Sequence, residues 1–442
     1  MATTERSRLG AVVMAAGLGT RMRSDVPKHF HPLLGRRMVD WVIEAARELG
    51  ADPLVVVTAP ASADSFDGIM VAVQAEPLGT GDAVRSAREA LASHTGDVLV
   101  LSGDAPGLTA GLLLGLVETH RREEASVTVL SFEPPDAGSY GRVVRSADGS
   151  LEAIVEARDA TPEQLALREV NSSIYVFRGE RLWPVLDRLS PHNAQGELYL
   201  TDSIALLAGD GAKVAAHKGG TSMEVEGVNT RVELAAAAEA LRDRINEQHM
   251  LAGVTIVDPS ATWIDAEVEI EADAVIHPFT VIRGASRVRA GAEVGPHVVI
   301  QDAVVGAGAV VGPFCYLRPG TVLGAGAKAG TFVEIKNTRI GERTKVPHLS
   351  YLGDADIGED TNIAASNVTV NLDHRSGTKG RTTIGSNVRT GVDNSFVAPV
   401  TVGDDAWIAA GSVITEDVPP GSLAIARARQ VNKEGRGGKR ND

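Results

Sequence analysis

The chain has 442 residues, a formal net charge of −14 and only 4% aromatic residues. This length exceeds what a single hydrophobic core usually supports, so we expect two or more domains. The acidic balance and the few aromatic rings exclude the basic, stacking surface that single-stranded nucleic acid requires, so we predict no nucleic-acid partner.

Cysteine usage and the start of the chain indicate a cellular compartment. The single cysteine, Cys315, cannot form an intramolecular disulfide, and the polar start "MATTERSRLG" has no apolar segment of a secretory signal. No apolar run approaches the length of a membrane span. These features predict a soluble, cytoplasmic protein with no membrane partner.

Up to about residue 230, apolar runs alternate with amphipathic stretches. We interpret "AVVMAAG", "PLVVVTA", "DVLVLSGD" and "SVTVLSF" as strands, and "MVDWVIEAARELG" and "TGDAVRSAREALASH" as helices. This alternation is typical of βαβ units around a mostly parallel sheet. It predicts a Rossmann-like α/β domain over residues 1–231.

A glycine-rich loop follows the first predicted strand, within "GAVVMAAGLGTRMRSDVPKHF" at residues 10–30. Gly17 and Gly19 can take φ > 0 and admit an anion close to the backbone, and Arg21, Arg23 and Lys28 follow. The spacing matches neither the P-loop nor the dinucleotide fingerprint. A bound phosphate and a tight strand-to-helix turn with solvated cations both remain open from these residues alone.

A change of pattern marks the second half. The alanine-rich segment 232–252 predicts a long linking helix, and from residue 253 a period of six replaces the helical signal. The repeated positions are Val305, Val311, Leu317, Leu323, Ala329 and Ile335, then Ile340, Val346, Leu352, Ile357, Ile363 and Thr369, then Ile384, Thr390, Phe396, Val402, Ile408 and Ile414.

Three such hexapeptides form one coil of a left-handed parallel β-helix with the repeated residue inside. We therefore predict a β-helix domain over 253–424 and a C-terminal tail over 425–442. The interruption at 371–383 should leave the prism as a loop. Arg318, Lys336, His348 and Tyr351 on consecutive coils are not needed by a purely structural solenoid, which is the alternative.

Together the two halves resemble the bifunctional N-acetylglucosamine-1-phosphate uridyltransferase/glucosamine-1-phosphate acetyltransferase family. The resemblance extends from Ala11 to about Gln430, and its signature A-A-G-x-G-T-R-M-x-S-x-x-P-K occupies residues 15–28. It implies acetylation of glucosamine-1-phosphate by acetyl-CoA, then Mg²⁺-dependent uridylyl transfer from UTP with release of pyrophosphate. The product, UDP-N-acetylglucosamine, serves peptidoglycan and cell-wall biogenesis, and the family implies a homotrimer acting on small molecules.

By this resemblance, Arg21 and Lys28 are the catalytic cations of the first half, where they neutralise phosphate oxygens. Asp104 and Asn229 are its Mg²⁺ ligands, since few hard oxygens suit that ion. The implied nucleotide-binding residues are Ala15, Ala16, Gly17, Lys28, Gln74, Gly79 and Thr80. The implied sugar-phosphate residues are Gly141, Glu156, Asn171 and Asn229.

In the second half, the resemblance makes His348 the general base that takes a proton from the substrate amine, since histidine titrates near neutrality. The implied acceptor-binding residues are Arg318, Lys336, Tyr351, Asn362 and Asn371. The implied CoA-binding residues are Ala365, Ala409 and Arg427.

The chain departs from the family pattern at several positions. Asp82 and Ser102 replace the usual histidine and tyrosine, and Ala364 replaces a glycine. Leu372 replaces a tyrosine in a loop about two residues longer, which leaves Lys379 as the match to its lysine.

Three functional hypotheses therefore stand. The first is the bifunctional enzyme. The second is a nucleotidyltransferase whose β-helix acylates another amino sugar or is inactive. The third is a noncatalytic scaffold, which the retention of Arg21, Lys28, Asp104 and Asn229 disfavours.

Overall fold

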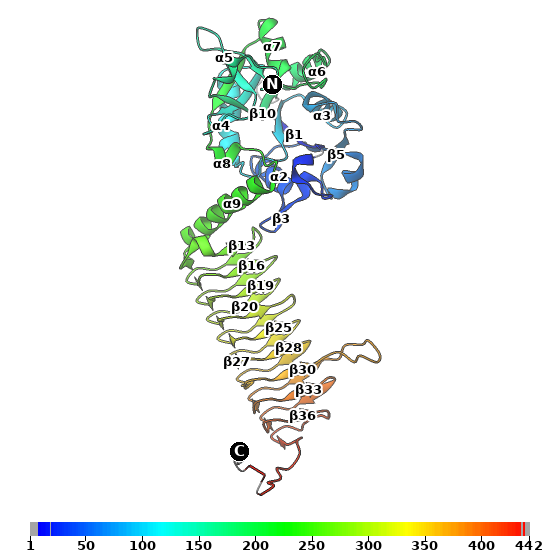
Figure 1. Ribbon diagram of the computed structural model, residues 1–442, viewed down its shortest axis with the longest axis vertical. Coiled ribbons are helices and arrows are strands. Elements are labelled where there is room, and N and C mark those ends of the chain that lie inside the picture. Colours follow the sequence, from blue (N-terminus) through cyan, green and yellow to red (C-terminus); the bar gives the residue numbers. More distant parts are fainter. Residues whose placement is uncertain (1–7, 18, 435, 438–442) are drawn as a thin grey trace, which may run out of the picture. The chain divides into compact units, whose positions relative to one another are not determined.

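The computed structural model describes residues 8–17, 19–434 and 436–437 (Figure 1). The chain divides into two compact units, residues 1–241 and 242–442. Residues 1–7, at the start of the predicted first domain, lie outside the described part. So do Leu18 in the glycine-rich loop and residues 435 and 438–442 in the predicted tail.

The first unit is built on a mixed, mostly parallel sheet with strand order β11-β7-β10-β6-β1-β4-β5 and the hairpin β8-β9 attached to β10. Strands β5, β4, β1 and β6 are mutually parallel, and β10 is antiparallel to both β6 and β7. This confirms the predicted fold class.

The strands of the unit are β1 (Leu9–Ala15), β2 (Pro32–Leu33), β3 (Arg36–Arg37), β4 (Leu54–Thr58), β5 (Met70–Val73), β6 (Asp97–Ser102), β7 (Val127–Phe132), β8 (Arg142–Arg145), β9 (Leu151–Val155), β10 (Val170–Arg178) and β11 (Val214–Lys218).

Helices cover both faces of this sheet, so β1 is buried along its whole length. Ala11 and Val13 belong to one apolar cluster, whereas Val12 and Met14 belong to the other, as the two-residue period of a strand requires. The helices and 3₁₀ turns are η1 (Thr20–Met22), η2 (Lys28–Phe30), α2 (Met38–Glu48), η3 (Pro60–Ser65), α3 (Thr80–Ser86), α4 (Ala110–Arg122), α5 (Pro162–Leu165), α6 (Gly179–Leu186), α7 (Asp202–Gly209), α8 (Ser222–Val225) and α9 (Arg231–Leu251).

One predicted helix is shorter than expected. The segment "TGDAVRSAREALASH" forms helix only over Thr80–Ser86, and the following residues form turns. The N–H groups of Ala87 and Arg88 bond to carbonyls three residues earlier, which tightens the backbone beyond an α-helix. The hydroxyl of Ser86, the last residue of the helix, donates to the Asp82 carbonyl at 3.0 Å, a side-chain bond that competes with the helical backbone bond to the same carbonyl.

The parallel strands bring distant loops to one edge of the sheet. The glycine-rich loop follows β1, residues 103–109 follow β6, and residues 74–79 follow β5. All three connections leave the carboxyl ends of parallel strands, which is where open α/β sheets bind ligands.

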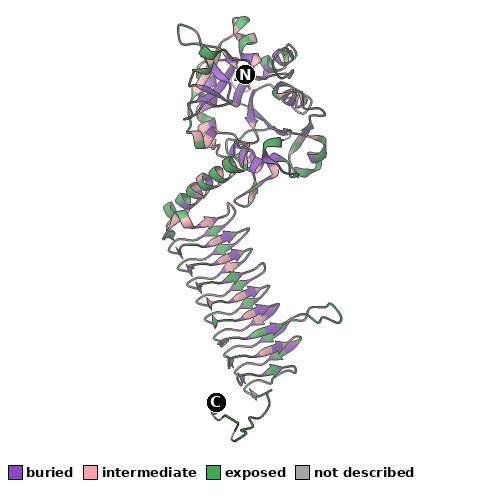
Figure 2. Cartoon of the chain, in the orientation of Figure 1, coloured by how far each residue is buried: buried purple, intermediate pink, exposed green. Residues whose placement is uncertain are grey.

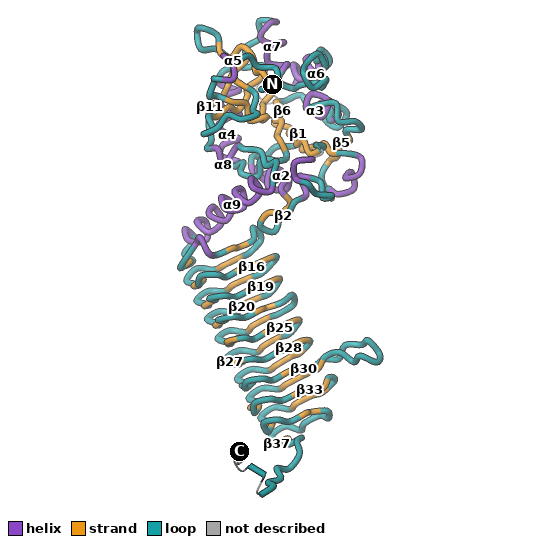
Figure 3. Tube along the Cα trace, viewed as in Figure 1, coloured by secondary structure: helices purple, strands orange, loops and turns teal. Residues whose placement is uncertain are grey.

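The second unit is the predicted left-handed parallel β-helix, with three faces of short, stacked parallel strands (Figure 3). Face 1 contains β12 (Thr255–Ile256), β15 (Val275–Ile276), β18 (Glu293–Val294), β21 (Val310–Val311), β24 (Lys328–Thr331), β27 (Lys345–His348), β32 (Arg389–Thr390), β35 (Trp407–Ile408) and β37 (Leu423–Ala424). Face 2 contains β13 (Trp263–Ile264), β16 (Val281–Arg283), β19 (Val299–Gln301), β22 (Tyr316–Leu317), β25 (Glu334–Lys336), β28 (Tyr351–Gly353), β30 (Val368–Val370), β33 (Ser395–Val397) and β36 (Val413–Ile414). Face 3 contains β14 (Glu269–Ile270), β17 (Arg287–Val288), β20 (Val304–Val305), β23 (Val322–Leu323), β26 (Arg339–Ile340), β29 (Ala355–Ile357), β31 (Thr382–Ile384) and β34 (Val400–Val402).

The six-residue period coincides with the interior of this prism. Every repeated position named above is buried, including Thr369 and Thr390, and the buried strips are visible along the coils in Figure 2. Thr369 compensates its buried hydroxyl by donating to the carbonyl of Gly353 at 2.9 Å. The segment after β30 leaves the prism as the predicted loop (Figure 1), with a bridge between Leu372 and Lys379.

The alanine-rich segment forms the predicted helix, α9. Within the second unit, Asn246 of α9 donates to the carbonyls of Pro259 and Thr262 at 2.9 and 3.0 Å, which attaches the end of the helix to the first coil. Among the described residues, no helix is both long and apolar enough to cross a membrane.

Candidate functional site

Gly19 gives the phosphate loop its backbone path. It has φ of 61°, and a Cβ there would lie 2.4 Å from Cβ of Lys28. The absence of a side chain therefore lets the loop fold onto the lysine. Gly17 does not share this role as predicted, because it is absent from the positive-φ glycines and a Cβ on it would make only an ordinary 3.7 Å contact with His29.

Four predicted residues converge at the carboxyl edge of the sheet. The ammonium of Lys28 forms an ion pair with Asp104, and both side chains are largely buried. Asn229 Oδ1 accepts from Lys28 Nζ at 3.0 Å and from a terminal guanidinium nitrogen of Arg21 at 2.9 Å. Two cations and the side-chain oxygens of Asp104 and Asn229 therefore meet at one point.

Asp104 is kept ionised by this environment. Its burial would raise the pKa of its carboxyl, but the charge and hydrogen bond of Lys28, together with its other polar neighbours, outweigh burial and lower the pKa. Ser102, at the position of the family's tyrosine, donates to Asp104 Oδ1 at 2.6 Å. Burial lowers the pKa of neighbouring His29 to about 4, so its imidazole is neutral near pH 7.

The predicted nucleotide-binding residues Gln74, Gly79 and Thr80 are ordered by side-chain hydrogen bonds. Gln74 is buried, and its amide donates to the Gly79 carbonyl at 3.1 Å and to Asp82 at 3.0 Å. Thr80 Oγ1 accepts from the N–H of Leu200 at 3.0 Å. Asp82, which departs from the family pattern, therefore fixes the orientation of the Gln74 amide.

The predicted sugar-binding residues form a second cluster. The Asn171 N–H donates to the Gly141 carbonyl at 2.9 Å, and an ideal Cβ on Gly141 would lie 3.4 Å from a Glu156 carboxylate oxygen. Glu156 accepts from the hydroxyl of Thr201 at 3.2 Å, and burial raises the pKa of its carboxyl. Strand β10 bulges just after Asn171, which re-aims the backbone at this point.

Sequence reasoning did not single out Tyr199. Its hydroxyl is buried and has no hydrogen-bond partner in the described part of the chain. Burial, with the nearby charges of Asp159 and Glu156, raises the pKa of this phenol to about 12, so the hydroxyl is a proton donor at neutral pH. A buried donor near Glu156 suits a sugar hydroxyl, but no sequence spacing distinguishes it from a core tyrosine.

A cavity of about 410 Å³ adjoins the loops that carry Asp104 and Asn229. It is lined by Tyr140, Glu226, Gly227 and Glu233 among others. A Cβ on Gly227 would lie 3.0 Å from Asp104 Oδ1, so this wall touches the convergence point of Lys28 and Asn229. Its volume is that of a small-molecule site.

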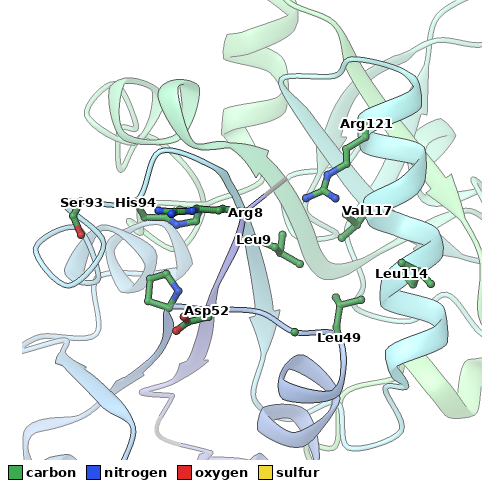
Figure 4. Close-up of a pocket in the computed structure, with 11 residues that line it drawn as sticks. Arg8, Leu9, Leu49, Asp52, Ser93, His94, Leu114, Val117 and Arg121 are labelled. Carbon is green, nitrogen blue, oxygen red and sulfur yellow. The ribbon is translucent and has the colours of Figure 1, made fainter. Parts of the chain in front are cut away.

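Another cavity, of about 600 Å³, lies at the opposite edge of the sheet (Figure 4). Its lining includes Arg8, Asp52 and His94, which precede or begin β1, β4 and β6. None of the predicted site residues lines it. The volume of a cavity alone therefore does not identify the candidate active site of this unit.

On the β-helix, one group of predicted acetyl-site residues lies on face 2. Arg318 pairs with Glu334 at 2.8 Å, and Glu334 lies beside Tyr351 on the next coil. An ideal Cβ on Gly353 would lie 2.4 Å from the Tyr351 hydroxyl, so the phenol rests on this glycine. Lys336 pairs in register with Gly353 and completes the group.

Asp354 joins this group to the extruded loop. Its carboxylate accepts from Asn337 at 2.6 Å and from Asn371. Burial opposes ionisation of Asp354, but these hydrogen bonds and the charges of Lys336 and Lys379 hold the pKa of its carboxyl below the ordinary value. The charge of Lys379 thus acts on the carboxylate that Asn371 contacts.

The second group belongs to face 1. His348 ends β27 with an exposed side chain, and Asn362 lies between β27 and β32. Ala365 follows Asn362 towards the corner where face 1 meets face 2. Arg427 donates to the carbonyl of Ala410 at 2.9 Å and so lies beside Ala409.

The structure therefore does not gather all the predicted acetyl-site residues at one point of a single chain. Lys336 and Tyr351 lie in strands of face 2, and Arg318 and Asn371 directly follow such strands. Asn362 pairs with strands of face 1, and Ala409 directly follows β35 of that face. His348 and Tyr351 are separated by the corner residue Leu349, which has φ of 48°. Outward side chains on two faces of a triangular prism diverge.

These observations define a class of protein. A mixed sheet with a cation-lined glycine loop and a carboxylate at its carboxyl edge is a nucleotidyltransferase-type unit, and a left-handed β-helix of hexapeptides with polar outward side chains is typical of acyltransferases.

Comparison with known proteins narrows the class. Residues 11–199 match the MobA-like NTP transferase domain. The chain is 50% identical to the bifunctional protein GlmU of Streptomyces avermitilis, over 96% of this chain and 93% of the relative. It is 49% identical to the proteins of the same name from Streptomyces coelicolor and Mycobacterium tuberculosis, over 96% of this chain and 93% and 91% of theirs. The chain belongs to the GlmU family.

Proposed function

We propose that this chain synthesises UDP-N-acetylglucosamine in two steps. The β-helix unit acetylates glucosamine-1-phosphate with acetyl-CoA, and the α/β unit then transfers uridylyl from UTP to N-acetylglucosamine-1-phosphate. The near full-length identity to bifunctional GlmU proteins supports both activities. The convergence of Lys28, Arg21, Asp104 and Asn229 is the observation that carries the uridylyl step.

In the uridylyl step, a phosphate oxygen of the sugar phosphate attacks the α-phosphorus of UTP. The bond from that phosphorus to the β-bridging oxygen breaks, and pyrophosphate leaves. Lys28 and Arg21 neutralise the charge that develops on the phosphate oxygens, because preplaced cations stabilise such transition states. The N–H groups of Ala15, Ala16 and Gly17 line the approach of the nucleotide.

The donor set of Asp104 and Asn229 fits Mg²⁺. Both oxygens already accept from one ammonium, that of Lys28, so they face a common cation position. Two hard oxygens leave the remaining coordination to phosphates and water, as magnesium prefers. Bound there, the ion would neutralise and orient phosphate oxygens, and Lys28 would then turn to the substrate.

Base and sugar selection follow from the two ordered clusters. Gln74 offers its side-chain carbonyl oxygen, because its N–H groups already donate to Gly79 and Asp82, and the backbone around Gly79 and Thr80 offers peptide groups to the uracil edge. Gly141, Glu156 and Asn171 orient the sugar, with Tyr199 as an additional hydroxyl donor.

In the acetyl step, the amine nitrogen of glucosamine-1-phosphate attacks the thioester carbon. His348 takes the proton that the nitrogen loses, and the CoA thiolate leaves. Arg318 and Lys336 hold the sugar phosphate, Tyr351, Asn362 and Asn371 hold the sugar, and Ala365, Ala409 and Arg427 line the CoA path.

The division of these residues between two faces supports a homotrimer. Face 2 of one copy and face 1 of another can enclose a substrate that neither face encloses alone. Cyclic closure of three copies satisfies such a heterologous contact. We place the enzyme in the cytoplasm, where its lone thiol remains reduced.

Assays on the full chain test the assignments. Lys28→Ala and Asp104→Ala should each lower pyrophosphate release about 100-fold or more, the scale of losing one electrostatic stabiliser. Both should leave CoA thiol release intact. His348→Ala should show the reverse pattern.

Lys213→Ala serves as the matched control, because it removes an exposed lysine that pairs with Glu123 in the same unit. Pyrophosphate release at the wild-type rate in Lys28→Ala and Asp104→Ala would contradict the uridylyl site. Equal thiol release in wild type and His348→Ala would contradict the acetyl site.

A further inference from the structure

One outward row of face 1 combines cations with an exposed tryptophan. Strand pairing aligns the outward positions from coil to coil, and Asn362 continues the row between β27 and β32. The row reads Lys328, Lys345, Asn362, Arg389, Trp407 and Leu423.

The charged residues of this row are all cations, and the charge of Arg389 acts on the nearby Asp360 carboxyl. Lys328 and Lys345 lie directly opposite each other, and like charges in that position are destabilising. Arg389 donates to the carbonyls of Asp360 and Val388 at 2.6 and 3.1 Å rather than to a carboxylate. In a chain of net charge −14, this row is a local basic strip.

Trp407 is exposed beside these cations. Its side chain is 60% exposed, and it lies in register between Arg389 and Leu423. A large aromatic surface left in water costs free energy, and its flat ring suits stacking on another planar group. An aromatic ring next to cations is the pattern that binds a base together with its phosphates.

The position of Trp407 matches one end of an extended CoA molecule. Trp407 lies three coils beyond His348, which corresponds to about 14 Å along the prism at the usual strand spacing. The pantetheine arm has the length of about four residues and spans roughly 14 Å when extended. A thioester beside His348 therefore brings the nucleotide to the coil of Trp407.

We propose that Trp407 stacks on the adenine of CoA and that Arg389 contacts its phosphates, an inference that rests on the proposed acetyltransferase. Ala409, two residues further, faces the same way as Trp407 because of the strand period. Arg427 reaches the same strand through the Ala410 carbonyl at 2.9 Å. The basic strip thus recognises the nucleotide half of acetyl-CoA, at a distance from the reacting thioester beside His348.

Truncated donors test this assignment. With acetyl-CoA, Trp407→Ala should raise KM about 5- to 100-fold, the scale of losing one base stack, with little change in kcat. With S-acetylpantetheine, which lacks the nucleotide, wild type and Trp407→Ala should have the same KM. Trp407→Phe should restore most of the acetyl-CoA affinity, and Arg389→Gln should also raise KM for acetyl-CoA alone.

Val413→Ala is the matched control, since Val413 is a 50% exposed apolar side chain on face 2. This substitution should change neither the KM for acetyl-CoA nor the KM for S-acetylpantetheine. Equal changes with both donors in Trp407→Ala, or no change with either, would overturn the assignment. A loss of trimer mass in Trp407→Ala would instead identify Trp407 as a subunit contact.

A binding measurement separates this inference from the acetyltransferase proposal. Adenosine 3′,5′-bisphosphate should quench the tryptophan fluorescence of wild type but not the remaining fluorescence of Trp407→Phe. If wild type is quenched but transfers no acetyl group, the nucleotide site is supported and the proposed acetyltransferase activity is contradicted. Acetyl transfer without a difference in quenching would contradict the stacking role.

Discussion

At the residue scale, Gly19 determines where Lys28 can lie. Its positive φ of 61° and the 2.4 Å approach of an added Cβ to Lys28 act at the same position. The lysine carries the charge, but the glycine permits its placement over Asp104. The chemistry of the loop therefore depends on a residue with no functional group.

Gly19→Ala should lower pyrophosphate release at least 10-fold, because the new Cβ displaces Lys28 and the backbone is strained by about 1–2 kcal/mol. Gly149→Ala is its control, since Gly149 also has a positive φ, 86°, but a Cβ there meets nothing within 4 Å. This control introduces backbone strain at a glycine without displacing Lys28. Equal losses in the two variants would contradict the proposed placement of Lys28.

His29 makes the stability of the first unit depend on pH. Burial lowers its folded pKa from 6.5 to about 4. Between these values the unfolded chain binds the proton and the folded chain does not, so the contribution of His29 is present above pH 6.5 and is lost as pH falls towards 4. The full loss corresponds to about 3 kcal/mol of unfolding free energy.

His29→Asn should remove this part of the pH dependence. Hydrogen exchange of peptides from β1 and β6, corrected for intrinsic rates at pH 7 and 4.5, measures the local opening free energy in wild type and variant. Identical pH dependences would show that His29 is not the titrating group.

The two residue clusters also show the limit of sequence reasoning. Arg21 and Lys28 were predicted because they lie in a dense signature at residues 15–28, and Asp104 and Asn229 were predicted from the family resemblance further along the chain. Tyr199 was not, because burial without a partner is a three-dimensional property. Both Gly17 and Gly19 were predicted to take positive φ, but only Gly19 does so, because the sequence does not specify the backbone dihedral angles.

At the element scale, the β-helix was predictable and α3 was not. A six-residue period repeated over many coils places each aliphatic residue independently inside the prism, so local errors do not accumulate. The end of α3 at Ser86 depends instead on local hydrogen bonds, namely the bond from the Ser86 hydroxyl to the Asp82 carbonyl and the three-residue bonds of Ala87 and Arg88. Such bonds are not evident from helix propensity.

Asp354 links the prism to its loop, and Asp354→Asn tests that link. Asparagine tolerates the observed φ of 53° but removes the charge that accepts from Asn337 and Asn371. KM for glucosamine-1-phosphate should rise about 10-fold or more, as expected for hydrogen bonds to a charged group. KM for acetyl-CoA should change little.

Asp302→Asn is the control, because Asp302 occupies another positive-φ corner, with φ of 45°, and accepts from the N–H of Ala285 at 3.0 Å outside the predicted site. It should leave both KM values unchanged. A rise in KM for acetyl-CoA equal to that for the sugar phosphate, in Asp354→Asn, would indicate general distortion of the coil instead.

At the scale of the whole molecule, the acetyl-site residues pose a geometric problem. Lys336 projects from face 2, and Asn362 projects from face 1. The sequence order placed both in one predicted site, but it cannot say whether they come from one copy or two. A shared site between copies resolves the divergence, because one copy's face 2 then meets another copy's face 1.

Mixed oligomers test this arrangement. Lys336→Ala and Asn362→Ala should each abolish most thiol release when expressed alone. When the two variants are co-expressed, a site made of face 2 from the Asn362→Ala chain and face 1 from the Lys336→Ala chain contains both native residues. Random cyclic assembly then restores about a quarter of the wild-type rate.

Light scattering should give three times the 46.2 kDa chain mass for each preparation. Pyrophosphate release, which needs only the first unit, should be unchanged throughout and so reports that the chains are folded. Thiol release in the mixture no higher than in the separate variants would place both residues in a site made by one copy.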